Sequence, residues 1–139
     1  MKIVLTTHGD LAEGLLDSYR MIAGNTDNII PINLTDDGIG VFSKKLRTTL
    51  DNLIDKDKVL ILCDLKGGTP YNESLKYQLE NEGTVEIVTG VNLPMLMETA
   101  LSIEHSDLKT LKELAMNSGI SAIQEENLDL SEDDFDLEF

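Results

Sequence analysis

The sequence lacks most of the features that mark secreted, membrane-spanning or nucleic-acid-binding proteins. Its 139 residues include one cysteine, no tryptophan, three Tyr and three Phe. A single cysteine excludes an intramolecular disulfide framework, and the scarcity of aromatic residues leaves Leu, Ile, Val and Met to form the core. No apolar run approaches the roughly 20 residues that span a bilayer, and the amino terminus lacks the pattern of a signal peptide. We therefore expect a cytoplasmic protein without a membrane-inserted segment.

Basic residues are also scarce, since 11 Lys and Arg stand against 26 Asp and Glu, for a net charge of −15. This charge argues against a nucleic acid or an anionic membrane as partner. Residues 125–139 hold eight acidic residues and no basic one, whereas residues 1–124 carry a net charge of −7. A stretch with so much charge and so few apolar groups cannot form a core by itself. We expect a single domain over 1–124 and a disordered acidic tail over 125–139.

Short apolar runs alternate with segments whose apolar residues recur at helical spacing. The apolar runs lie at 2–6, 28–34, 59–63 and 85–89, and the helical patterns cover 11–23, 41–54, 71–80, 95–103 and 108–117. This alternation predicts an α/β fold with a doubly wound, mostly parallel sheet and helices on both faces. Residues 120–123 alternate in the manner of one further short strand.

The position of Pro31 predicts the order of the strands. Pro31 lies inside the second apolar run, and because proline cannot donate to a central ladder, this strand belongs at an edge of the sheet. The order 2-1-3-4 follows, with strands one and three as neighbours. Ligands of open α/β sheets bind in the crevice at the carboxyl ends of such strands. His8 and Asp64, 56 positions apart, are therefore predicted to face each other there.

The residues at this crevice have complementary chemistry. Asp64 can accept a hydrogen bond from one ring nitrogen of His8, which leaves the other nitrogen as a nucleophile. Gly67 and Gly68 allow the backbone to approach an anion and to aim its N–H groups at it. Thr69 is placed to cap the helix that follows, whose positive end favours an anion, and its hydroxyl can donate to a phosphoryl oxygen. Together these residues predict a phosphohistidine site.

Other polar residues have simpler interpretations. Asp10, with Glu13 three residues on, forms a capping-box pattern for the first helix. Asp36 and its neighbour Asp37 lack further ligand spacing and are interpreted as a solvated loop. Cys63 is interpreted as a small buried hydrophobe, and His105, which has no cluster of partners, as structural or exposed. We expect no metal site and no cofactor.

Three stretches of the chain resemble a known family. They are Val4-Leu-Thr-Thr-His8-Gly9, the run from Leu62 to Asn72 that contains Asp64-Leu-Lys-Gly67-Gly68-Thr69-Pro70, and Val88-Thr-Gly-Val-Asn-Leu-Pro-Met95. In this order and spacing they are similar to the enzyme IIA component of the mannose-type (mannose, fructose, sorbose) phosphoenolpyruvate-dependent sugar phosphotransferase system. The resemblance covers residues 1 to about 123.

The resemblance implies a role for each residue of the crevice. His8 would be phosphorylated by the histidine of the carrier HPr and would pass the phosphoryl group to a histidine of a IIB component, as a phosphotransferase with a phosphohistidine intermediate. Asp64 would orient His8, and Thr69 with the backbone of Gly67 and Gly68 would hold the phosphoryl oxygens. The sugar itself is not specified by this chain, because specificity would lie in the transporter.

The resemblance also implies an assembly. Members of the family form homodimers in which the last strand, here about 119–124, runs antiparallel and is exchanged between subunits. Some relatives continue into a fused IIB domain, whereas the acidic tail here implies a separate IIB chain. Two alternatives stay open within the same fold, a regulatory module and the phosphotransfer subunit of a dihydroxyacetone kinase. A flavodoxin-like nucleotide or flavin binder is disfavoured, because the first strand is not followed by a G-x-G-x-x-G motif.

Overall fold

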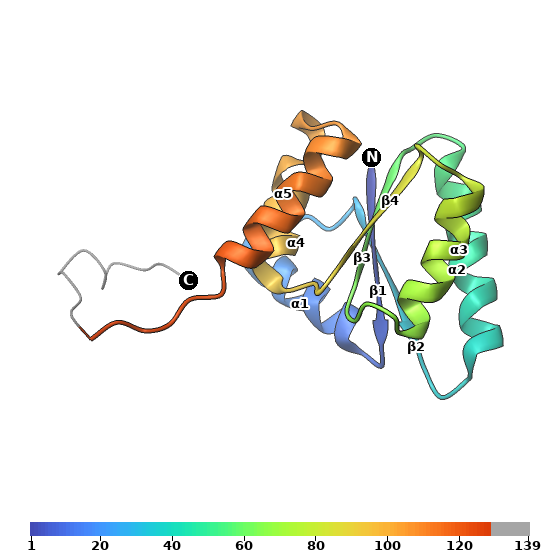
Figure 1. Cartoon of the computed structure of the whole chain (residues 1–139), viewed down its shortest axis with the longest axis horizontal. Helices are drawn as coiled ribbons and strands as arrows, with labels where there is room; N and C mark the ends of the chain where they lie inside the picture. Colours follow the sequence, from blue (N-terminus) through green and yellow to red (C-terminus); the bar gives the residue numbers. More distant parts are fainter. Residues whose placement is uncertain (129–139) are drawn as a thin grey trace.

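The computed structural model describes residues 1–128, which form a parallel four-stranded sheet between two layers of helices (Figure 1). The strands are β1 (Lys2–His8), β2 (Ile29–Leu34), β3 (Val59–Cys63) and β4 (Val85–Thr89), in the order β2-β1-β3-β4. The predicted strand order is confirmed, and β2, which contains Pro31, lies at an edge. The disorder predicted for the tail concerns mainly residues 129–139, which lie outside the described residues, and the domain boundary at residue 124 stays a prediction.

Helices cover both faces of the sheet, as predicted. The face shown on the left of Figure 1 carries α1 (Leu11–Ala23), α4 (Leu93–Ser102), the short 3₁₀ helix η1 (Ile103–His105) and α5 (Leu108–Ser121), and the other face carries α2 (Ile39–Ile54) and α3 (Thr69–Glu80). Strand β3 lies between both layers, so all five of its residues are buried. Leu60 and Leu62 contribute to the core on one face, and Val59, Ile61 and Cys63 to the core on the other.

The pairing of β1 and β3 brings the predicted crevice together. Both strands run in the same direction, and Thr6 of β1 pairs with Cys63 of β3. The next residues along the two strands therefore emerge at the same edge of the sheet. These residues include His8, which ends β1, and Asp64, which follows β3 directly.

The capping residues of two helices differ from the sequence prediction. Asp10 precedes α1 with φ −90° and ψ 13°, and its side chain makes no capping bond. This backbone conformation differs from the extended one typical of a capping residue, and the hydroxyl of Thr7 accepts from the N–H of Ala12 instead, at 2.8 Å. Helix α3 begins at Thr69, with Gly68 rather than Thr69 in the capping position. Thr69 is thus part of the first helical turn.

The short strand predicted over 119–124 does not form, because α5 continues to Ser121 and the described residues after it contain no further strand. Gly119 is buried inside this helix, where a side chain would meet Met95 of α4. Asn92 donates to the carbonyl of Gly119 at 3.0 Å and also accepts from the N–H of Met95. The absence of a side chain at Gly119 thus serves helix packing and does not end the helix. Assembly as a homodimer stays a prediction.

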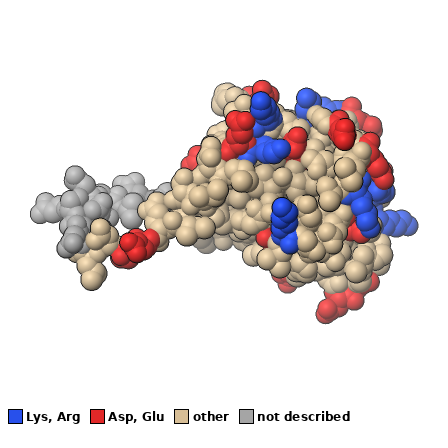
Figure 2. Space-filling view, viewed as in Figure 1, with Lys and Arg blue, Asp and Glu red and all other residues tan. Residues whose placement is uncertain are grey.

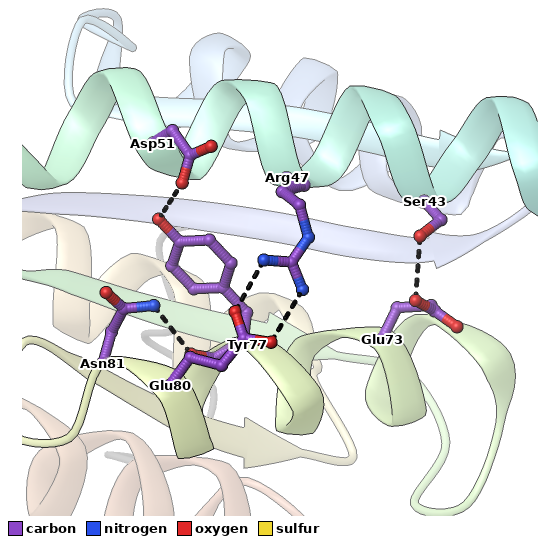
Figure 3. Close-up of polar contacts among 7 residues, drawn as sticks. All are labelled: Ser43, Arg47, Asp51, Glu73, Tyr77, Glu80 and Asn81. Atoms are coloured by element: carbon purple, nitrogen blue, oxygen red, sulfur yellow. Dashed lines mark hydrogen bonds and ion pairs between the residues drawn. The ribbon is translucent and has the colours of Figure 1, made fainter.

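Polar contacts join α2 to α3 on the other face of the sheet (Figure 3). The hydroxyl of Tyr77 donates to Asp51 at 2.7 Å, and Arg47 forms an ion pair with Glu80 at 2.6 Å. The guanidinium of Arg47 also lies over the ring of Tyr77, 5.3 Å from its centre. These contacts hold the second half of α3 against α2.

The surface charge is mixed on the face that Figure 2 shows, where Lys and Arg side chains lie among Asp and Glu side chains. The acidic excess therefore does not form one continuous field on that face. Among residues 1–128, every helix is too short or too polar to cross a lipid bilayer.

The two bonds of Asn92 lead to a stability prediction. Replacing Asn92 by Ala removes both the cap of α4 and the bond to the carbonyl of Gly119, so the free energy of unfolding should fall by about 2 kcal/mol. Asp107 is a matched control, because it caps α5 through the N–H of Thr110 and lies at the surface. Urea denaturation of both variants should show a smaller loss for Asp107→Ala. Equal losses would show that the bond to Gly119 adds no stability.

Candidate functional site

His8 and Asp64 meet at the carboxyl edge of the sheet, as predicted. The Nδ1 atom of His8 lies 2.8 Å from Oδ2 of Asp64. The imidazole ends β1, whereas the carboxylate follows β3, so the contact depends on the pairing of these two strands. The side chain of His8 is 45% exposed and that of Asp64 only 10%. Asp64 is thus the inner partner and His8 the one that faces solvent.

Three N–H groups fix the carboxylate of Asp64. Oδ2 accepts from the backbone N–H of His8 at 2.9 Å as well as from the ring, and Oδ1 accepts from the backbone N–H of Leu65 at 2.8 Å. Partial burial raises the pKa of Asp64, but the hydrogen bonds from the backbone and ring of His8 and from Leu65 outweigh this effect, and the pKa is lower than the ordinary value. Asp64 is therefore ionised at neutral pH.

The charge on Asp64 determines which nitrogen of His8 is free. An ionised carboxylate can only accept hydrogen bonds, so Nδ1 of His8 must carry the hydrogen in the contact with Asp64. In the neutral imidazole the lone pair is then on Nε2. The site therefore presents an oriented imidazole whose free nitrogen has the lone pair that a nucleophile needs.

Gly68 lies directly against the imidazole. A Cβ atom at this position would be 2.8 Å from Cε1 of His8 and 3.5 Å from Nε2, so no other residue fits without a shift of the ring. Gly67 before it has φ +85°, a conformation that glycine adopts freely. The side chain of Asn72 donates to the carbonyl of Gly67 at 3.1 Å and ties the loop to α3.

The structure brings His8, Asp64 and Gly68 into contact, whereas Gly67 and Thr69 flank Gly68 in the chain. Thr69 is half-buried as the first residue of α3. The amino-terminal turn of a helix carries unpaired N–H groups and a partial positive charge. An anion near Nε2 of His8 would thus lie close to the loop that begins α3.

A hollow extends from His8 on the side of β2. It is lined by His8, Gly9, Asp10, Leu34 and the two residues that follow Leu34 in the chain. Among the contacts that shape this edge, sequence reasoning missed those of Thr7, Leu65 and Asn72. Of these contacts, only that of Asn72 could have been recognised in the sequence. Asn72 follows two glycines closely, and an amide side chain in such a place can donate to a backbone carbonyl of the glycine turn.

Comparisons with known proteins agree with this geometry. A family model described as "PTS system fructose IIA component", where PTS is the phosphotransferase system, matches residues 2–116. The "PTS system fructose-specific EIIA component" of Bacillus subtilis is 33% identical over 112 residues, which are 80% of this chain and 76% of that protein. The "PTS system mannose-specific EIIAB component" of Escherichia coli K12 is 31% identical over 124 residues, and the chain spans 38% of its length.

Solved structures show the same relationship. The mannose/sorbose-specific IIA subunit from Enterococcus faecalis is 30% identical with a TM-score of 0.82, and the match covers 94% of this chain and 97% of that one. The component EIIA from Streptococcus agalactiae is 32% identical with a TM-score of 0.79, over 89% and 95% of the two chains. The family model covers the four strands, α1 to α4, the first part of α5 and the edge that carries His8. The chain therefore belongs to the family of mannose-type IIA components of the phosphotransferase system.

Proposed function

We propose that this chain is a phosphoryl carrier that accepts a phosphoryl group from phospho-HPr on Nε2 of His8 and passes it to a separate IIB component of a mannose-type sugar transporter. The observation that carries the proposal is the contact between Nδ1 of His8 and ionised Asp64, which leaves Nε2 free at the edge of the sheet. A general role in phosphoryl transfer follows from the family.

The proposed reaction is an in-line displacement between two histidines. The lone pair of Nε2 attacks the phosphorus atom, a new N–P bond forms, and the N–P bond to the donor histidine breaks with its electron pair left on the donor ring. His8 becomes positively charged during the transfer, and the carboxylate of Asp64 stabilises that charge. Transfer to the IIB component repeats these steps with His8 as the donor. The protein contributes mainly position and electrostatics, as in other phosphoryl transfers.

The phosphoryl oxygens need donors beside Nε2. We assign this role to the backbone of Gly67 and Gly68 and to the hydroxyl of Thr69, because these groups lie at the start of α3 and Gly68 lies against the imidazole. The partial positive charge of the helix end favours the same anion. This assignment needs no metal and no cofactor.

The partners in this proposal come from the family. The relatives in Bacillus subtilis and Lacticaseibacillus casei carry the EIIA name alone, and a separate IIB component is proposed by analogy with them. Association as a homodimer and a location in the cytoplasm belong to the same proposal.

Replacing His8 by Ala should abolish phosphoryl acceptance and leave stability nearly unchanged, because the side chain is 45% exposed. Phosphoenolpyruvate labelled with ³²P, enzyme I and HPr would supply the group, and an acid-labile, alkali-stable label would identify phosphohistidine. His105→Ala is the control and should accept the group at the normal rate. Normal labelling of the His8 variant would refute the proposal.

Replacing Asp64 by Asn should slow the transfer by about 100-fold. The comparable Asp→Asn change in a serine-protease triad costs about 10⁴-fold in rate, and we expect a smaller loss because positioning also drives phosphoryl transfer. The side-chain oxygens of Asp64 accept only from N–H groups. Either orientation of the Asn amide therefore directs its NH₂ group at one of these donors. Rapid-quench kinetics measures the loss, and an unchanged rate would show that Asp64 only ends the strand.

The same variant should change the response to acid. The pKa of Asp64 is lower in the folded chain than its ordinary value, so the ionised group stabilises the fold at neutral pH and this contribution disappears as the pH falls through the folded pKa. Asp64→Asn should remove that part of the acid dependence of the unfolding free energy.

Nitrogen chemical shifts of His8 should report hydrogen on Nδ1 in the wild type.

Replacing Gly68 by Ala should slow phosphoryl acceptance without unfolding the chain, because the new methyl group would displace the His8 ring from its present position. Gly14→Ala in α1 is the matched control, since no atom lies within 4 Å of the new methyl group. In a helix this change should raise stability by up to about 1 kcal/mol and leave the transfer rate unaltered. A wild-type transfer rate in the Gly68→Ala variant, with the hydrogen bond between the His8 ring and Asp64 intact, would show that phosphoryl transfer does not require the close approach of Gly68 to the imidazole.

A further inference from the structure

A second hollow lies at the opposite edge of the sheet from His8. It is formed where α1 and α4 end and β2 begins, with Ile29 at the start of the strand among its lining residues. Because β1 and β2 are parallel and Ile29 pairs with Ile3 near the start of β1, this edge is the amino-terminal one. The hollow has a volume of about 190 Å³, below the range of about 300–1,000 Å³ for drug-sized ligands. It suits a small molecule.

The hydroxyl of Tyr19 is the main reason to regard this hollow as a binding site. Tyr19 is only 3% exposed and lines the hollow. Among residues 1–128, none forms a hydrogen bond with its hydroxyl, and burial raises the pKa of Tyr19 without any partner that opposes the shift. The hydroxyl oxygen is not one of the fully buried polar atoms without a partner, so it opens onto the hollow, where a bound molecule can replace water as its hydrogen-bond partner.

Four further polar residues line the hollow around Tyr19, namely Asn25, Asn28, Glu104 and His105. Asn25 already accepts from the N–H of Asp27 with its oxygen, at 2.8 Å, so its NH₂ group can donate to a ligand. Glu104 can only accept when ionised, and the imidazole of His105 both donates and accepts when neutral. The hollow thus has donors and acceptors close together.

The charges around the hollow disfavour an anion. Glu104 carries a negative charge, and α1 and α4 both direct their carboxyl ends toward this edge, where a helix has a partial negative charge. The ammonium of Lys2, bonded to Asn28 at 2.9 Å, partly offsets them. A ligand without net charge fits best, and Ala23 and Leu101 offer apolar contact to its carbon atoms.

We propose that this hollow binds a small uncharged polyhydroxyl compound, a monosaccharide or a sugar alcohol. Each hydroxyl of such a compound both donates and accepts, which matches Tyr19, Asn25, Glu104 and His105, and its C–H groups match the apolar lining. The site is separate from the phosphoryl site at His8, and it does not depend on the proposed transfer reaction.

Titration of the ¹⁵N-labelled chain tests the proposal. The probes are D-glucose, D-fructose and D-mannitol, with ethanolamine as the cationic comparison. We expect at least one polyol to cause saturable shifts of amide signals from residues such as Tyr19 and Leu101, without shifts at His8 and Gly68. The proposal is overturned if no polyol gives a saturable response at these residues, or if ethanolamine binds there more tightly than all three polyols.

The variant Tyr19→Phe tests the role of the unpaired hydroxyl. It removes one oxygen that has no partner, so the fold should remain intact and phosphoryl acceptance at His8 should be unchanged. The dissociation constant of the bound polyol should rise about 5-fold, the effect of one lost neutral hydrogen bond. Tyr71→Phe in α3 makes the same chemical change outside the hollow and should not alter it. Equal affinity of the wild type and Tyr19→Phe would overturn the proposal.

Discussion

The carboxylate of Asp64 is the interaction on which the edge of this sheet depends. It joins the end of β1 to the end of β3 through the backbone N–H and the ring of His8, and it also accepts from the loop that leads to α3. Three hydrogen bonds keep the group ionised despite its burial. One charged side chain therefore positions the imidazole, selects its tautomer and shapes the start of the glycine loop.

The sequence predicts the arrangement of the sheet and the pairing of His8 with Asp64 because both follow from general rules of chain topology. Pro31 places its strand at an edge, alternating strands and helices imply a parallel sheet, and neighbouring parallel strands end together. These rules operate on the backbone and need no knowledge of how side chains pack. The strand order and the contact at 2.8 Å were accordingly predictable.

Features that depend on packing were not predictable. Gly119 looks like the end of a helix in the sequence, yet α5 continues because the absence of a side chain lets it approach Met95. The cap of α1 comes from Thr7 on the preceding strand and not from Asp10, since the backbone at Asp10 is not extended. Likewise, the role of Gly68 as a contact of the imidazole is visible only when β1 and α3 are placed together.

The bonds between Asp64 and His8 have a consequence for recognition. Both bonds use atoms of His8 other than Nε2, namely the backbone nitrogen and Nδ1. A group attached to Nε2, as in the proposed function, would therefore leave these two bonds between the ends of β1 and β3 in place. A partner protein would then distinguish the two forms by direct contact with the attached group and its charge, and not by a change at this junction.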